Sequence, residues 1–164
     1  MNDVLPDVLA PELDVLFCGN AAGAASARVG APYAGPGNAF WPTLHEVGLT
    51  PVRLVPAEFR RALEFGLGLT DVCKTRSGSD AEVGSAGHDP VRLVATVERT
   101  RPAHLAFVGK RAARIALGRP IAYGPQPEEI GGARVWVLPS TSGAARGFWD
   151  IGPWRDLAAA AATR

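Results

Sequence analysis

The chain has 164 residues, a formal net charge of +1 and a hydrophobic fraction of 47%. A chain of this length is expected to form one domain with a buried core, and its near-neutral charge excludes a uniformly basic coat for nucleic acid. Cys18 and Cys73 are far apart and form no CxxC pair, which argues against a zinc site or an iron–sulfur cluster. With no signal-peptide pattern and no apolar run long enough to cross a bilayer, we expect a cytoplasmic protein that has reduced thiols and no membrane partner.

The N-terminal half alternates short apolar runs with loops. Residues 1–12 are an irregular lead-in interrupted by prolines, and residues 13–17 (LDVLF) predict a buried strand. Glycine and proline then recur so often over residues 19–37 that we expect a long functional loop without a regular element. A helix is predicted to start near Asn38, a residue type that caps helices, and a second helix to span residues 56–66.

The C-terminal half predicts strands that pass directly into helices. Residues 66–80 (GLGLTDVCKTRSGSD) form a short buried piece that ends in a polar loop. Residues 89–100 show helical spacing, with Asp89 as the cap and Pro90 at the first helical position. The remaining predicted elements are a strand over residues 103–109, a helix over 110–117, a strand over 133–140 and a helix over 154–164.

This alternation of strands and helices predicts an α/β fold. We expect residues 1–164 to form a single domain, a three-layer α/β/α sandwich with a mostly parallel central sheet. In such a sheet, ligands bind beyond the carboxyl ends of the strands. The loops that begin at Gly19, Lys110 and Ser140 are therefore expected to share one rim, and the function is expected there.

The glycine-rich loop after the first strand is open to three interpretations. Its spacing from Gly19 to Gly23 differs from the GxGxxG turn that binds dinucleotides. Gly109 and Lys110 lack the earlier glycine and the following Ser or Thr of a Walker loop. The third interpretation is a bare main chain that surrounds a flat, neutral ligand such as a nucleobase.

Residues near this loop favour the nucleobase. The ring of Tyr33 can stack on a base, and the amide of Asn38 carries a donor and an acceptor that can match a base edge. The small side chains of Ala21 and Ala22 let the main chain come close to a ligand. Together these residues indicate a pocket for a flat heterocycle.

Two separated motifs resemble those of a known enzyme family. The stretch LFCGNAAGAASARVGAPYAGPGNAFW (residues 16–41) is similar to the first motif region of the mismatch-specific uracil-DNA glycosylases, within the uracil-DNA glycosylase superfamily. The stretch VWVLPSTSGAAR (residues 135–146) resembles their second motif, the loop that enters the DNA. The segments FGLGLTDVCKTRSGSD and LAFVGKRAA stand in the order that the family has, so the resemblance covers residues 13–154.

The resemblance implies a monofunctional DNA glycosylase that acts as a monomer on uracil-containing DNA, single- or double-stranded. Such an enzyme flips a base out of the DNA, cuts the N-glycosidic bond and leaves an abasic site. Uracil is the expected base, with thymine, hypoxanthine or modified pyrimidines as further substrates. The family's chemistry needs neither a metal nor an organic cofactor, because main-chain N–H groups can stabilise the departing base anion.

The first motif departs from the family at one position. The family's loop has a GINPG-like pattern whose asparagine positions the attacking water, whereas GNAAG places Asn20 one residue early and Ala21 in the asparagine's place. The candidates for positioning water or reading the base are therefore Asn20, Asn38 and Asp71; the alternative is an enzyme that works mainly by stabilising the departing base. Asn38 also matches an asparagine of the related hypoxanthine-DNA glycosylases, and LPSTS (residues 138–142) resembles that branch too.

The second motif predicts contacts to DNA. Ser140 replaces an asparagine of the family, and Ala144 and Ala145 replace bulkier residues of the wedge, so we expect weak plugging of the duplex and little dependence on the opposite base. Lys110, Arg111, Ser142, Gly143, Ala144, Ala145 and Arg146 are the predicted DNA-binding residues. The predicted base contacts are Gly19, Ala21, Ala22, Gly23, Tyr33 and Ser140.

Several of these residues also have ordinary structural explanations. Asn38 is well placed to cap a helix, Asp71 can pair with Lys74, and Ser140 and Ser142 can cap the last helix. Ala21 also leaves open an alternative function, a non-catalytic nucleic-acid or nucleotide-binding module that keeps the base pocket. An assay for abasic sites separates that module from an enzyme.

Overall fold

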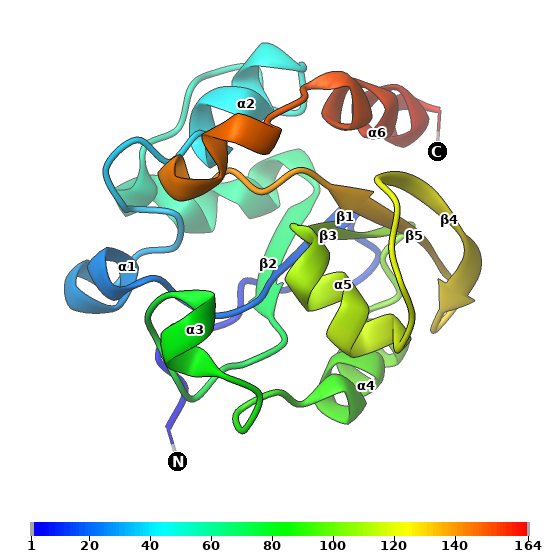
Figure 1. The fold of residues 1–164 in the computed structure, drawn as a ribbon. Coiled ribbons are helices and arrows are strands. Elements are labelled where there is room, and N and C mark those ends of the chain that lie inside the picture. Colours follow the sequence, from blue (N-terminus) through cyan, green and yellow to red (C-terminus); the bar gives the residue numbers. More distant parts are fainter. Residues whose placement is uncertain (1, 164) are drawn as a thin grey trace.

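A computed structural model describes residues 2–163, whose strands form one sheet in the order β2–β1–β3–β5–β4 (Figure 1). β1 (Val15–Gly19), β2 (Leu67–Asp71), β3 (His104–Val108) and β5 (Ala133–Leu138) are parallel to one another. Only β4 (Gly124–Ile130), at the edge, runs antiparallel among these strands. The predicted α/β class and the mostly parallel sheet are therefore confirmed.

Helices cover both faces of the sheet, because every central strand is buried on both sides. One face packs against α2 (Phe40–Glu46), the 3₁₀ helix η1 (Pro56–Phe65) and α6 (Gly152–Ala162). The other face packs against α4 (Pro90–Thr100) and α5 (Lys110–Leu117) (Figure 1). These layers are the predicted three-layer sandwich.

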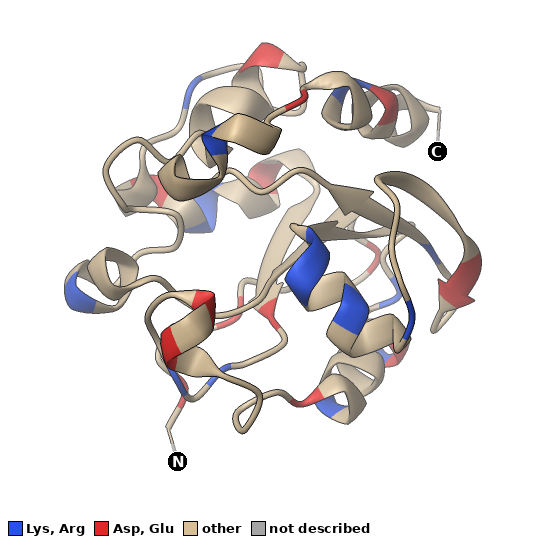
Figure 2. Ribbon diagram, viewed as in Figure 1, with Lys and Arg blue, Asp and Glu red and all other residues tan. Residues whose placement is uncertain are grey.

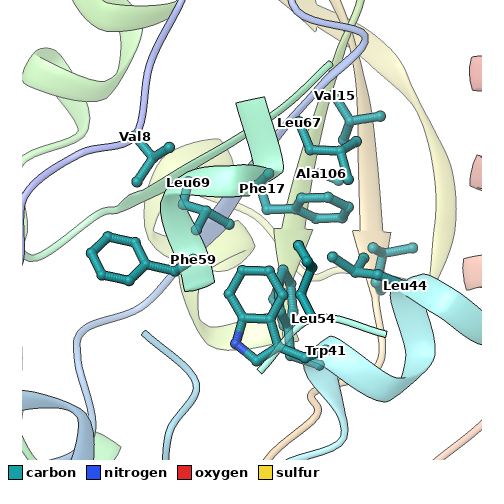
Figure 3. Close-up of a cluster of buried hydrophobic side chains, with 14 of the residues drawn as sticks. Val8, Val15, Phe17, Trp41, Leu44, Leu54, Phe59, Leu67, Leu69 and Ala106 are labelled. Atoms are coloured by element: carbon teal, nitrogen blue, oxygen red, sulfur yellow. The ribbon is translucent and has the colours of Figure 1, made fainter. Parts of the chain in front are cut away.

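The larger core cluster lies between the sheet and α2, η1 and α6 (Figure 3). Successive residues of β1 point to opposite faces, so Phe17 enters this cluster and Leu16 enters the other. The ring of Phe17 lies 5.2 Å from that of Phe40 in an edge-to-face arrangement, and Trp154 stacks beside Phe17 at 5.8 Å. Truncation of Phe17 to alanine would cost about 3–5 kcal/mol of unfolding free energy.

The expectation that residues 19–37 contain no regular element is wrong. The segment forms α1 (Ala24–Val29), a single short helix. Its glycines bound the helix instead of preventing it: Gly23 is an extended N-cap, and Gly30 ends the helix in the left-handed conformation with φ 74°. Ser26 Oγ then accepts a hydrogen bond from the N–H of Ala34, which shapes the chain after the helix.

Other boundaries differ in detail from the prediction. The cap at Asp89 and the first-turn Pro90 of α4 are confirmed, since Asp89 accepts a hydrogen bond from the N–H of Arg92. α2 begins at Phe40, two residues after Asn38, and the buried piece over residues 66–80 contains β2. Besides α1, three elements were not predicted: α3 (Asp80–Val83), β4 and the 3₁₀ helix η2 (Gly143–Phe148).

β4 was missed because it carries two prolines, Pro125 and Pro127. Its register with β5 is irregular between Pro125 and Glu129, and an irregular edge strand tolerates residues that cannot donate to the ladder. Within residues 2–163, none of the helices is both long enough and apolar enough to cross a membrane.

Candidate active site

A crevice of about 530 Å³ opens beyond the carboxyl ends of the parallel strands. The loops that begin at Gly19, Lys110 and Ser140 all line it, as predicted from the order of the elements. α3 and η2 supply the rest of the rim. Other lining residues used below are Asn20, Ala21, Gly23, Tyr33, Asp71, Asp80, Arg111, Ser142, Ala144, Ala145 and Phe148.

Gly19 and Asp71 lie opposite each other at the ends of β1 and β2, because the two strands are parallel and these residues are paired in register. A Cβ placed on Gly19 would lie 2.5 Å from Asp71 Oδ1 and 3.2 Å from Tyr33 Oη. A side chain at position 19 would therefore displace the carboxylate, which explains the glycine by close approach. The bare end of β1 brings the Asp71 carboxylate and the Tyr33 hydroxyl to one place.

The carboxylate of Asp71 is only 16% exposed, and burial raises its pKa to about 6. Lys74 opposes this shift, but its Nζ lies 3.9 Å from Asp71 Oδ2 and 2.9 Å from Asp7 Oδ1. Asp7, from the N-terminal lead-in, adds a further negative charge that raises the pKa of Asp71. Asp71 therefore changes its protonation state near neutral pH, as a general base requires.

Tyr33 is fixed by the aromatic core. Its backbone is in the left-handed region with φ 57°, which is uncommon for a residue with a side chain. Its ring stacks on Phe40 with 3.8 Å between centroids and 12° between planes. Burial and the Asp71 carboxylate raise the pKa of the Tyr33 hydroxyl well above its ordinary value, so this group is neutral and can donate. One face of the ring is thus covered, and a ligand can meet only the remaining surface.

The loop after β1 borders the crevice with its main chain and with small side chains. Gly23 and the half-buried Ala21 line the crevice, and Ala22 is buried beside a smaller cavity that Tyr33 and Asp71 also line. Asn20 lines the crevice as well, and its amide hydrogen-bonds to Asp80 and His88. The loop thus places a bare backbone next to a carboxylate.

Asn38 is not brought into this crevice. Its Oδ1 accepts a hydrogen bond from the N–H of Phe40 at 3.0 Å, so the side chain binds the main chain at the start of α2, although the N-cap position itself is Ala39. Of the three predicted candidates for positioning water or reading the base, the fold therefore brings together Asn20 and Asp71.

Cations stand on α5 and acidic residues on α3, on two sides of the crevice (Figure 2). Lys110 Nζ lies 4.4 Å from the centroid of the Tyr123 ring, and Arg111 Nη2 donates to the carbonyl oxygen of Gly84 at 3.3 Å. Arg111 Nε is buried and has no hydrogen-bond partner within residues 2–163. Each of the two side chains thus already makes a contact within the protein.

The second predicted motif forms η2 and the turn before it. Ser142 caps η2 by accepting from the N–H of Ala144, and Ser140 Oγ accepts from the N–H of Ser142. The prediction that Ser140 and Ser142 cap the last helix is therefore wrong: Ser142 caps η2, and the N-cap of α6 is Ile151, which makes no side-chain cap hydrogen bond. Ala144 and Ala145 line the crevice, while the exposed Arg146 extends toward Gly37.

Sequence reasoning missed Phe148, the last residue of η2. Its side chain is 76% exposed and lies on the crevice rim, although aromatic rings are usually buried. The available signal was an aromatic residue in a loop otherwise made of glycine, alanine and polar residues. Asp80, the last residue of the segment FGLGLTDVCKTRSGSD, and His88, which belongs to no motif, were also missed. In the part of the chain that the structure describes, no three His, Cys, Asp or Glu residues cluster as metal ligands.

Comparison with known proteins gives a consistent assignment. The family model described as "Uracil DNA glycosylase superfamily" matches residues 6–159. Among solved structures, the fold is similar to the solution NMR structure of a presumed uracil DNA glycosylase from Methanosarcina acetivorans, with a TM-score of 0.68. That similarity covers 96% of this chain and 94% of the other at 23% identity, so it supports the fold alone.

Proposed function

The chain belongs to the uracil DNA glycosylase superfamily, and from that premise we propose that it excises uracil from DNA by hydrolysing the N-glycosidic bond. The observation that carries this proposal is the buried Asp71 carboxylate beside Gly19, which lines a crevice of about 530 Å³. Such a site accepts a flipped, flat base and supplies a group that titrates near neutral pH.

In the proposed reaction, water adds to C1′ of the deoxyribose and the base departs with the bonding electrons. Asp71 orients the water and takes one of its protons, which leaves the sugar with a hydroxyl group. The base leaves as an anion and then takes up a proton, so the products are an abasic site and the free base. We assign stabilisation of that anion to main-chain N–H groups of residues 19–23 and to the neutral Tyr33 hydroxyl.

DNA is the proposed macromolecular partner, and the rim of the crevice suits its backbone. Lys110, Arg111 and Arg146 are assigned contacts to phosphates, together with the N–H groups at the start of α5. The acidic α3 disfavours phosphates on the opposite side, so we expect the strand to run along α5 and η2.

Phe148 revises the expectation of weak plugging that the alanines of the second motif suggested. We assign its exposed ring to the space that the flipped nucleotide vacates, because apolar side chains that enter a base stack separate the bases. The enzyme should then prefer a duplex in which a base pair must be opened.

Within the superfamily, the motifs favour a place near the mismatch-specific glycosylases with features of the hypoxanthine-DNA glycosylases. This finer assignment rests on sequence resemblance, as do thymine and hypoxanthine as further bases. A panel of oligonucleotides with uracil, hypoxanthine or a G:T mismatch decides among them.

The proposed function is tested by incubating labelled uracil oligonucleotides with the protein, followed by alkali and detection of strand breaks. Breaks at uracil that are lost in Asp71→Asn support the enzyme. Ala21, at the place of the family's asparagine, favours the alternative of a non-catalytic binding module. DNA binding without breaks on any lesion, at enzyme in excess of substrate, would establish that alternative.

A further inference from the structure

The side chain of Asn20 is bound by two residues that the proposed reaction does not use. Its Nδ2 donates to Asp80 Oδ1 at 2.7 Å, and its Oδ1 lies 2.7 Å from His88 Nε2. Asp80 begins α3, and His88 directly precedes Asp89, the N-cap of α4. Three segments far apart in the sequence therefore meet at one amide on the crevice rim.

The directions of these hydrogen bonds fix the orientation of the Asn20 amide. A carboxylate oxygen accepts, so the NH₂ group of Asn20 faces Asp80 and its oxygen faces His88. The amide oxygen also only accepts, so His88 Nε2 donates to it. The other ring nitrogen, Nδ1, lies 3.1 Å from the carbonyl oxygen of Ser85, so the imidazole ring has a polar neighbour at each nitrogen.

The backbone around His88 is anchored on both sides. His88 forms an antiparallel bridge with Cys73, and the N–H of Cys73 donates to the carbonyl oxygen of Asn20 at 2.8 Å. On the other side, the next residue, Asp89, caps α4 by accepting from the N–H of Arg92. The fold thus places the ring of His88 beside Asn20.

We propose that His88 is a positioning residue whose ring, together with Asp80, fixes the Asn20 amide in one orientation. An amide has two N–H donors and an oxygen that accepts twice. One N–H is used by Asp80 and one acceptor position by His88, which leaves one of each for a ligand. The inference rests on the proposed function, because the ligand is taken to be the excised base or the attacking water.

The groups around His88 come from several elements. Asp80 of α3 lies across the amide, and Asp89 is adjacent in the chain. A Cβ placed on the neighbouring Gly87 would lie 2.5 Å from Cys73 Sγ and 3.0 Å from Arg76 Cδ, so a side chain at position 87 would displace its neighbours and disturb the turn before His88.

NMR of the side-chain amide groups tests this arrangement without any use of activity. We expect the Asn20 NH₂ resonances of the wild type to be protected from exchange. In His88→Phe the same NH₂ resonances should exchange faster, while thermal unfolding reports whether the variant folds. Unprotected Asn20 NH₂ resonances in the wild type, or equal exchange in His88→Phe, would overturn the proposal.

Kinetics test the link to Asn20. We expect His88→Phe to lower kcat about fivefold, the scale of one hydrogen bond. His88→Gln should recover part of the loss because its amide still donates. Added to Asn20→Ala, His88→Phe should cost nothing more, since both act through one group. Independent, multiplicative losses would overturn the proposal.

A control variant and the wild type distinguish a failure of the His88 proposal from a failure of the proposed function. His45→Phe replaces an exposed histidine on α2, outside the crevice, and should leave the rate unchanged. A wild type that cleaves no lesion would refute the proposed function, and the NMR result would still decide the arrangement at His88.

Discussion

The two walls of the crevice differ in how deeply their residues are buried. The wall from β1 and β2 is buried and tightly packed, with Gly19 enclosed and the Asp71 carboxylate next to it. The wall from α5 and η2 is open, and it exposes Arg146 and the ring of Phe148. A buried carboxylate acquires a shifted pKa, whereas exposed cations remain free to meet phosphates. We therefore assign the chemistry to the first wall and the DNA contacts to the second.

The sharpest test of this division is Asp71→Asn, which keeps the shape of the side chain and removes the base. We expect kcat to fall by about 100-fold or more, as measured in single turnovers on uracil DNA. The wild-type rate should rise with pH through about 6 and then level off, because the carboxylate must be ionised. Asp156→Asn, exposed on α6, is the matched control, and equal losses in both would refute the assignment.

The same substitution should stabilise the protein at neutral pH. The native pKa of Asp71, about 6, lies above the unfolded value near 3.8, so its ionisation destabilises the native state. Asp71→Asn removes that penalty of about 3 kcal/mol, an order-of-magnitude value from the shift. The gain in melting temperature should be full above pH 6 and vanish below about pH 4. A lower melting temperature at pH 7 would contradict it.

On the open wall, Phe148→Ala should lower the rate of excision from double-stranded DNA only. The loss of the apolar ring that fills the vacated space should slow excision from double-stranded DNA about tenfold, because unstacking a base step costs a few kcal/mol. Excision from single strands should stay close to that of the wild type. Val29→Ala, another exposed apolar residue on α1, serves as the control. An equal loss on both substrates would assign Phe148 to the base pocket instead.

Arg146→Gln should weaken binding without a change in chemistry. If Arg146 neutralises one phosphate, the slope of log K against log salt should fall by about one, whatever the DNA sequence. Fluorescence anisotropy over a salt series measures this slope. Arg28→Gln, exposed at the end of α1, should leave the slope unchanged, and an unchanged slope in Arg146→Gln would remove Arg146 from the interface.

The sequence was informative about the sheet and about the rim, because both depend on local patterns. Apolar strands that pass into helices predicted the parallel order, and this order put Gly19, Lys110 and Ser140 on one edge. The sequence identified Asp71 as a candidate, but it did not predict the buried environment of its carboxylate. That environment includes the ion pair of Lys74 with Asp7, which joins segments far apart in the sequence.

Elements whose formation depends on tertiary contacts were missed. The sequence of β4 resembles a proline-rich loop, and only its pairing with β5 makes it a strand. The glycines around α1 suggested a loop, whereas they form the two ends of the helix. Asn38 was a candidate because its amide suits a base, but in the fold its oxygen accepts from the N–H of Phe40 at the start of α2, outside the crevice. His88 carried no motif at all, since its partner Asn20 lies 68 positions away.

The buried wall also predicts a small effect from a distant residue. Asp7 lies in the N-terminal lead-in, where its carboxylate binds Lys74 and raises the pKa of Asp71. Asp7→Asn removes one negative charge. Among the described residues, Asp71 then carries the remaining carboxylate within 4 Å of Lys74 Nζ. Both changes lower the pKa of Asp71, so the acid limb of the pH–rate profile should move to lower pH.

The plateau rate of Asp7→Asn should be retained, because the ionised form of Asp71 is unchanged. The amide oxygen of the variant can still accept from Thr70, which now donates to Asp7 at 2.8 Å, so the lead-in should keep its place. Thermal unfolding should show a loss, since the buried Lys74 gives up its closer charged partner. If the acid limb of the pH–rate profile moved to higher pH, Lys74 would have turned away from Asp71. The N-terminal lead-in would then be what positions the charged groups of the buried wall.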